Sequence, residues 1–253
     1  MMDTQNSAPG LSSAPSLALL GFEPLRAAFE YLGLQFMAER ERPRGDGHPV
    51  VVFPGLATDR RHTAPLMSLC EKLGYQVHDW GRGFNTGPHG DIESWLDELS
   101  RDVEVLVAEP KASVSLIGWS LGGLYAREVA RRISRRVRLV ITIGTPFAGS
   151  SDGSHAGMLY RWLNGSQALD TGPALRRMET APPVPTTSIY SRTDGVVAWQ
   201  ACLQPGNRPT TENVEVDGSH CGLAWNPAVL DIVADRLAQP ENRWKRYGAA
   251  PST

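Results

Sequence analysis

The sequence predicts an α/β fold in which a mostly parallel sheet of about six strands carries helices on both faces. The main observation is an alternation of two kinds of segment. Short, wholly apolar runs such as VVVF at residues 50–53 are followed by longer amphipathic stretches such as residues 92–109. A strand that is apolar at every position is typical of a parallel sheet, because such a sheet is buried on both faces. The length of 253 residues suits one domain of this class.

Strands and helices are expected in alternation from residue 48 onward. The strands fall at residues 48–55, 75–81, 113–120, 137–147, 186–194 and 213–220, and the helices at residues 66–73, 92–109, 121–133 and 227–239. Ligands of such sheets bind where the strands end. The side chains that this fold gathers at one edge would therefore come from segments that lie far apart in the sequence.

A further amphipathic helix is expected at residues 23–39, before the first strand. Its apolar residues Leu25, Phe29, Leu32 and Phe36 recur at the spacing of one helix face. We expect this helix to pack on the domain. Attachment to a membrane surface is the alternative, although the helix has no basic face of the kind that anionic lipids attract.

The domain is expected to span residues 21–240, between a flexible tail at residues 1–20 and a second tail at residues 241–253. Residues 147–186 interrupt the alternation of strands and helices. A connection this long inside a compact domain usually serves function, so we expect a short lid there. Its apolar residues would cover a pocket or pack into the core, and the sequence leaves both interpretations open.

Charge, cysteine content and hydropathy narrow the classes of function. The formal net charge of −2 gives no reason to expect nucleic acid as a partner. Three cysteines are too few for a disulfide framework, although a Cys202–Cys221 bridge stays open for an exported protein. We recognise no secretory signal and no apolar run of membrane-spanning length. We therefore expect a cytoplasmic protein without stable membrane insertion, and the oligomeric state stays open.

Ser120 is the candidate nucleophile. It lies in the pattern G-x-S-x-G at residues 118–122, directly after a predicted strand and directly before a predicted helix. This context is that of a nucleophile elbow, in which glycines let the strand and the helix approach each other. The helix N-terminus then directs the N–H of Leu121 towards a developing oxyanion. Residues 149–153 also fit the pattern, but no predicted helix follows them directly.

A serine hydroxyl needs a base that accepts its proton and an acid that orients this base. In this class of fold the chain order is serine, acid, histidine, and only His155 and His220 follow Ser120. His220 ends the last predicted strand, whereas His155 lies in the insertion, so His220 is the expected base. Asp194, at the end of the preceding strand, is the expected acid. Asp217 lies shortly before His220 in the chain, and we interpret it as a turn residue.

Together these segments resemble the α/β-hydrolase superfamily, and its bacterial esterase and lipase branch in particular. The resemblance rests on GWSLGG, VITIGTPFAGS, SRTDGVV and VDGSHCGL, and it covers residues 50–237. It implies a reduced α/β-hydrolase fold with a short lid and a triad of Ser120, Asp194 and His220. It also implies an oxyanion hole made by the N–H groups of Leu56 and Leu121.

The sequence departs from this family before Leu56, where lipases commonly have His-Gly and this chain has Pro54-Gly55. The segment GRGFNTGPHGD at residues 81–91 has the glycine, asparagine and proline of a tight loop at the edge of the sheet. It could shape a substrate pocket or form a plain turn, and the sequence does not distinguish the two.

The resemblance implies a hydrolase that cleaves carboxylic esters with short or medium acyl chains through an acyl-enzyme. A thioesterase or acyltransferase with the same triad is the alternative, followed by a non-catalytic binding protein on the same scaffold. The expected partner is a small-molecule or lipid-like ester. No cofactor and no metal are expected, because the chain shows neither a phosphate-binding glycine motif nor a cluster of metal ligands.

Overall fold

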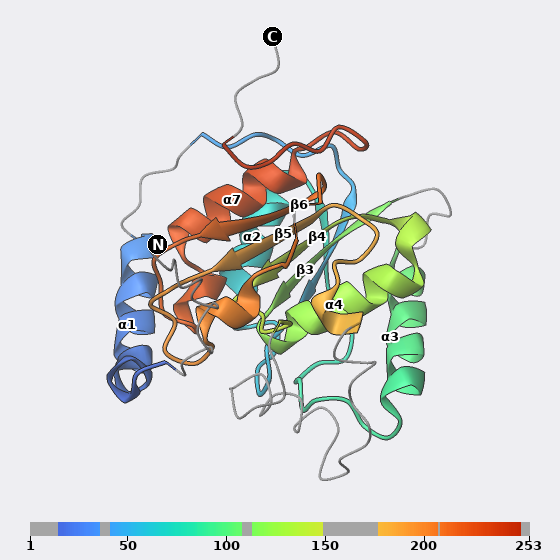
Figure 1. Cartoon of the computed structure of the whole chain (residues 1–253). Helices are drawn as coiled ribbons and strands as arrows, with labels where there is room; N and C mark the ends of the chain where they lie inside the picture. Colours follow the sequence, from blue (N-terminus) through green and yellow to red (C-terminus); the bar gives the residue numbers. More distant parts are fainter. Residues whose placement is uncertain (1–14, 36–40, 108–112, 149–176, 207, 249–253) are drawn as a thin grey trace, which may run out of the picture.

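One parallel sheet forms the centre of the molecule (Figure 1). The computed structural model describes residues 15–35, 41–107, 113–148, 177–206 and 208–248, and within them the sheet has six strands. Their order is β2-β1-β3-β4-β5-β6, and every neighbouring pair is parallel. The strands are β1 (Pro49–Phe53), β2 (Gln76–Asp79), β3 (Val114–Trp119), β4 (Val137–Ile143), β5 (Thr186–Tyr190) and β6 (Thr211–Glu215).

Helices cover both faces of this sheet, which confirms the predicted fold class (Figure 1). One face carries α2 (Ala64–Lys72) and α7 (Pro227–Leu237), and the other carries α3 (Ile92–Leu106) and α4 (Leu121–Arg132). The remaining elements are α1 (Leu17–Gln35), which packs against η3, and the short 3₁₀ helices η1 (Ser134–Arg136), η2 (Trp199–Cys202) and η3 (Gly222–Ala224).

The strand β1, which lies between β2 and β3, shows why its sequence is apolar at every position. Val50 and Val52 pack into the core beneath α2 and α7, whereas Val51 and Phe53 pack into the core beneath α3 and α4. All four side chains are at most 1% exposed. Burying a side chain of this size stabilises the fold by about 1.5–3 kcal/mol, so both faces of the strand contribute.

The path of the chain across the sheet reverses between β1 and β3. From β1 the chain moves to β2 at one edge, and β3 then lies on the opposite side of β1. In open parallel sheets, ligands bind outside the carboxyl ends of the strands at such a point. Ser120 directly follows β3, so the fold places it there.

The N-terminal helix α1 packs on the domain, but not through the apolar face that its periodicity marks for burial. Leu25, Phe29 and Leu32 are 53%, 64% and 53% exposed, whereas Glu23 on the opposite face is 3% exposed. Phe36, the fourth residue of the predicted stripe, lies outside the described residues. Periodicity shows which residues share a face, but the neighbours decide which face is buried. Here the neighbours are loops whose backbone N–H groups need acceptors, and carboxylates of α1 provide them.

Other expectations concern the tails and the insertion. α1 begins at Leu17, within the segment 1–20 that the sequence assigns to a tail. Of the expected lid at residues 147–186, the residues 149–176 lie outside the part of the chain that the structure describes. The second G-x-S-x-G pattern and His155 fall in that segment. The described helices include none that is long and apolar enough to cross a membrane.

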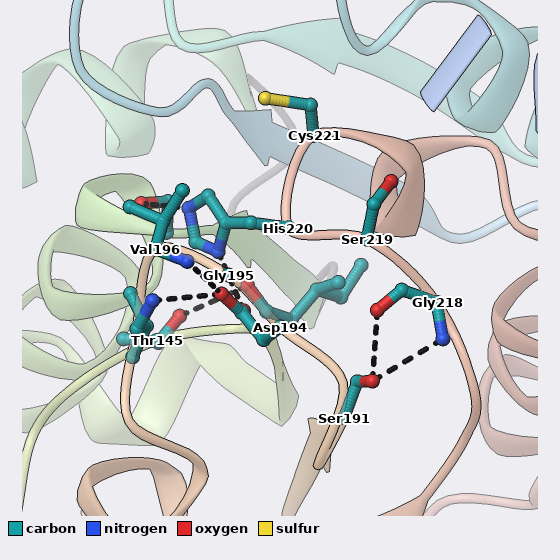
Figure 2. A network of polar contacts seen from close by, with 12 residues as sticks. Thr145, Ser191, Asp194, Gly195, Val196, Gly218, Ser219, His220 and Cys221 are labelled. Carbon is teal, nitrogen blue, oxygen red and sulfur yellow. Dashed lines mark hydrogen bonds and ion pairs between the residues drawn. The ribbon is translucent and has the colours of Figure 1, made fainter. Parts of the chain in front are cut away.

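All three cysteines are free thiols, so the Cys202–Cys221 bridge that the sequence leaves open is not formed. Cys202 is buried beside Tyr190 and Val197. Cys221 points away from the neighbouring loop of Asp194 in Figure 2. Burial raises the pKa of the Cys221 thiol to about 11, so this side chain is protonated near neutral pH.

Candidate active site

Ser120 occupies the tight turn between β3 and α4. Its backbone has a φ of 53° and a ψ of −124°. These angles are unfavourable for a residue with a side chain, so the surrounding structure must hold them. The N–H of Ser120 donates to the carbonyl of Ile143 over 2.8 Å, and its own carbonyl accepts from the N–H of Gly123 over 3.0 Å. The strand, turn and helix predicted around G-x-S-x-G are thus present, and the serine side chain is half-buried.

The glycines of this pattern lie where the strand and the helix come too close for a side chain. A Cβ atom on Gly118 would lie 2.3 Å from the carbonyl oxygen of Gly122. A Cβ atom on Gly122 would lie 2.3 Å from the carbonyl oxygen of Phe53. Both distances are far inside van der Waals contact, so the packing of α4 against β3 and β1 requires glycine at both positions.

His220 and Asp194 form a continuous hydrogen-bonded chain with Ser120. The Nε2 atom of His220 lies 3.0 Å from Ser120 Oγ, and its Nδ1 atom lies 2.7 Å from Oδ2 of Asp194. In Figure 2 the side chains of His220 and Asp194 face each other from two loops. These loops follow β6 and β5, so the structure brings together the three residues that the sequence predicts as a triad.

The second carboxylate oxygen of Asp194 is also occupied. Oδ1 accepts hydrogen bonds from the N–H groups of Val196 and Val197 over 2.8 and 2.7 Å. These bonds leave Oδ2 directed at the imidazole. Asp217, the competing acid in the sequence, is exposed, and its carbonyl accepts a hydrogen bond from the side chain of Asn226.

Burial and charge act in opposite directions on the pKa of His220. Burial of the ring disfavours its charged form, whereas the charge and the hydrogen bond of Asp194 favour it, and the charge of Glu23 adds to this effect. The balance raises the pKa of His220 above its ordinary value. A raised pKa suits a base that must hold the proton of a serine hydroxyl during a reaction.

Two further contacts connect the loops of the site. Ser191 Oγ donates to the carbonyl of Gly218 over 2.8 Å and accepts from the N–H of Gly218 over 3.2 Å (Figure 2). The indole N–H of Trp119 donates to the carbonyl of His220 over 3.0 Å. Because Trp119 directly precedes Ser120, this bond couples the histidine loop to the turn of the serine. Nothing in the sequence patterns distinguishes Ser191 or Trp119 from other polar and aromatic residues.

The expected oxyanion donors lie on both sides of the serine. Leu121 is the first residue of α4, so its N–H has no acceptor within the helix and lies at the positive end of the helix dipole. On the other side, a Cβ atom on Gly55 would lie 3.2 Å from the Cβ of Ser120. Leu56 therefore directly follows a residue that lies beside the serine.

Asn85 braces the loop that carries Leu56. Its side-chain amide donates to the carbonyl of Pro54 over 2.9 Å, and its backbone carbonyl accepts from the N–H of Ala57 over 2.8 Å. Asn85 is 0% exposed. Leu56 is therefore fixed from both sides by one residue of the segment 81–91, to which the sequence assigns no definite role. An asparagine between glycines is the one signal that could have pointed to it.

A groove with a volume of about 870 Å³ lies between α1 and the loop after β1. Tyr31 and Leu32 of α1 line one side, and Ala57 and Phe84 line another. Because Ala57 directly follows Leu56, the groove begins beside an expected oxyanion donor. These side chains suit the apolar part of a ligand, and Asp59, Arg61 and His62 add polar groups to the lining. Within the described residues, no group of three or more histidine, cysteine, aspartate or glutamate side chains could hold a metal ion.

A model of a known protein family matches residues 50–251, which is most of the chain. Its description is "Alpha/beta hydrolase family". The chain belongs to this family. The match extends from β1 of this alpha/beta hydrolase to beyond α7, and α1 precedes it.

Similar proteins of known activity include esterases and lipases. A curated relative, the pimeloyl-[acyl-carrier protein] methyl ester esterase of Shewanella woodyi, is 31% identical over 102 residues, which is 40% of this chain and 37% of the relative. The match thus spans little more than a third of the relative's length.

Several solved structures share the fold of this chain at low sequence identity. Lipase B of Aspergillus fumigatus has a TM-score of 0.61 and 19% identity, over 82% of this chain and 57% of that chain. An alpha/beta superfamily hydrolase of Oenococcus oeni has a TM-score of 0.56 and 15% identity, over 79% and 99%. Est1E of Butyrivibrio proteoclasticus, with ferulic acid bound, has a TM-score of 0.52 and 13% identity, over 76% and 86%.

Proposed function

We propose that this alpha/beta hydrolase is a serine hydrolase that cleaves carboxylic esters with short or medium acyl chains. Ser120 would be the nucleophile, His220 the base and Asp194 the acid that orients the base. The observation that carries the proposal is the continuous chain from Ser120 Oγ through the ring of His220 to Asp194, with distances of 3.0 and 2.7 Å. A serine in an ordinary turn requires neither this chain nor an unfavourable backbone conformation.

In the first half of the reaction, Ser120 Oγ forms a bond to the carbonyl carbon of the ester while His220 Nε2 accepts the hydroxyl proton. Asp194 holds the ring with Nδ1 protonated and stabilises the imidazolium that forms. The N–H groups of Leu56 and Leu121 stabilise the negative charge on the carbonyl oxygen. The bond to the alcohol oxygen then breaks, and His220 returns the proton to the leaving alcohol.

In the second half, water attacks the acyl-enzyme and transfers a proton to His220. The bond between the acyl carbon and Ser120 Oγ breaks, and the serine regains its proton from His220. The same steps apply to a thioester, or to an acyl acceptor other than water. The choice among these depends on the shape of the groove and on the access of water.

The groove beside α1 would hold the apolar part of the ester. Its lining by Tyr31, Leu32 and Phe84 and its position beside Ala57 support this placement. The names of similar proteins also support an ester as substrate. The curated relative is called a methyl ester esterase, and the fold neighbours include a lipase.

Labelling with a fluorophosphonate tests the proposed nucleophile. We expect an adduct on Ser120 in the wild type, identified by peptide mass spectrometry, and no adduct in Ser120→Ala. His220→Ala should label far more slowly, because the hydroxyl then has no base. A folded wild-type protein that forms no adduct, or a His220→Ala variant that reacts at the wild-type rate, would contradict the proposal.

Nitrophenyl esters of increasing acyl length, compared with matched thioesters and with added alcohol as acyl acceptor, test the substrate class. We expect the highest kcat/KM for esters of short or medium chain. A preference for thioesters, or transfer to the alcohol in place of hydrolysis, would favour the thioesterase or acyltransferase alternative. Binding of esters without turnover would favour a binding protein.

A further inference from the structure

A carboxylate of α1 binds both loops that carry the base and the acid. Glu23 Oε1 accepts hydrogen bonds from the N–H of Gly195 over 2.7 Å and from the N–H of His220 over 3.0 Å. Glu23 Oε2 accepts from the N–H of Cys221 over 3.3 Å. The side chain is 3% exposed, so water does not compete for these donors. One buried carboxylate therefore joins the loop after β5 to the loop after β6.

The loop of Asp194 is held by α1 on both sides of the aspartate. Arg26 donates to the carbonyl of Thr193 over 2.6 Å and to its hydroxyl over 3.0 Å. Gly195, on the other side, contacts the helix so closely that a Cβ atom there would lie 2.6 Å from the carbonyl oxygen of Leu19. Glycine at this position therefore permits the approach of α1 to the loop.

The loop of His220 is held by α1 in the same way. Its neighbour Cys221 donates to Glu23, and its other neighbour Ser219 donates its N–H to Glu30 Oε1 over 2.8 Å. This arrangement accounts for the orientation of α1. The polar face of the helix binds the two loops, and its apolar face consequently faces solvent.

We infer that Glu23 is a positioning residue of the candidate triad. Its carboxylate fixes the loops of Asp194 and His220 relative to each other, and its charge stabilises the imidazolium that forms when His220 takes the proton of Ser120. The inference rests on the proposed function. It assigns a role in the site to a helix that lies outside the segment matching the family model.

The charged and titratable groups that lie around His220 come from three elements. Asp194 lies on the loop after β5, Glu23 on α1, and His62 on the loop after β1. Asp194 and Glu23 both raise the pKa of His220, against the effect of burial. Burial and the charge of His220 lower the pKa of His62, whereas its hydrogen bond to the carbonyl of Cys221 raises it, and the balance lies below the ordinary value. Glu30 contacts Ser219 but is not among the groups that shift the pKa of His220.

The test is the second-order rate constant for reaction of Ser120 with a fluorophosphonate, measured across pH on the full chain. In this reaction Ser120 Oγ forms a bond to phosphorus, the phosphorus–fluorine bond breaks, fluoride leaves, and His220 accepts the hydroxyl proton. The rate falls at low pH as His220 becomes protonated. The midpoint of this acid limb therefore reports the pKa of His220 without knowledge of the natural substrate.

Glu23→Gln removes the charge but keeps the size of the side chain. We expect the plateau rate to fall about ten-fold, as is common when a group that orients a functional side chain is lost. We also expect the acid limb to move to lower pH, because one of the two charges that raise the pKa of His220 is gone while that of Asp194 remains. A merely structural role for Glu23 would change thermal stability but leave this midpoint in place.

Two further variants sharpen the result. Glu23→Asp keeps the charge but is too short to reach the same three N–H groups, so the plateau should fall while the midpoint stays nearer the wild-type pH. Glu30→Gln is the matched control, because Glu30 lies on the same helix and binds the loop of His220 through Ser219. The midpoint of this variant should equal that of the wild type. Thermal unfolding of each variant checks that it folds.

The outcomes separate the inference from the proposed function. No labelling of folded wild-type protein overturns the proposed function and the inference with it. Wild-type labelling with an unchanged midpoint in Glu23→Gln overturns the inference alone, whether or not the plateau rate falls, as does an equal shift of the midpoint in Glu30→Gln. If Glu23→Gln does not fold, a folded Glu23→Asp variant that reacts at the wild-type rate overturns the inference.

Discussion

The serine and its two partners are held at the edge of the sheet by different means. Ser120 lies on a turn that its own neighbours in the sequence build, and a Cβ atom on Gly118 would lie only 2.3 Å from the carbonyl oxygen of Gly122 across it. Asp194 and His220 lie on loops that a distant side chain joins, because Glu23 binds backbone N–H groups of both. The turn of the serine is built by consecutive residues that pack on β1 and β4, whereas the second arrangement joins residues from the two ends of the chain.

This difference predicts how substitutions act. The turn of the serine is part of the packing between β1, β3 and α4, so a change there should reduce stability and activity together. The two loops lie outside the sheet, so a change in their contacts should reduce activity more than stability. Four predictions, in order of decreasing effect on activity, test this contrast.

The largest effect is expected for Asp194→Asn. An asparagine can present its N–H₂ group to the ring and reverse the tautomer of His220, so kcat for an ester substrate should fall by about 10³–10⁴-fold, with little change in stability. The matched control is Asp217→Asn, which changes the other aspartate near the histidine. Equal losses in both variants would contradict the assignment of Asp194, and kinetics with a nitrophenyl ester decide between them.

Gly122→Ala should impair the turn of the serine. Its Cβ would lie 2.3 Å from the carbonyl oxygen of Phe53, so α4 must move away from β1. We expect a loss of about 1–3 kcal/mol in the free energy of unfolding and a fall in kcat of about 100-fold, because the serine and the N–H of Leu121 move with the helix. Chemical denaturation and ester kinetics measure the two effects.

The control for this variant is Gly33→Ala on α1, where nothing lies within 4 Å of the added Cβ. Alanine in a helix is favoured over glycine by about 0.5–1 kcal/mol, so this variant should be slightly more stable than the wild type. A Gly122→Ala protein with unchanged stability would show that the turn tolerates a side chain there. This result would contradict the expectation that changes in the turn reduce stability and activity together.

Asn85→Ala should loosen the loop that carries Leu56. An oxyanion donor is worth about 10²–10³ in kcat, and a donor that is displaced rather than removed should cost part of this, about 10–100-fold. KM should change little, because the oxyanion forms only after binding. Thr86→Ala, at the exposed neighbouring residue, is the control. An effect confined to KM would instead assign Asn85 to substrate binding.

The smallest effect is expected for Phe84→Ala. Phe84 lines the groove beside α1, so its loss should lower kcat/KM a few-fold for the longer nitrophenyl esters and leave the shortest ones unchanged. Val105→Ala, which alters an exposed apolar residue on α3, is the control. A uniform decrease across all chain lengths would mean that the groove does not hold the apolar part of the ester.

The fold could be predicted from the sequence because its signals are local. Each strand and helix that forms the layers has its own periodicity, and the runs that are apolar at every position, such as residues 50–53, indicate burial on both faces. The glycines around Ser120 and the order of serine, aspartate and histidine can also be recognised in the sequence. These features together indicated which edge of the sheet would gather the candidate triad.

The contacts around that triad were decided by the tertiary structure. The apolar periodicity of α1 indicates an amphipathic helix, yet its polar face is the buried one, because unpaired N–H groups of two distant loops bind its carboxylates. The roles of Glu23 and Asn85 have the same origin. The sequence does not indicate which partner a carboxylate or an amide will bind, since that partner lies up to 198 residues away and only folding brings the two together.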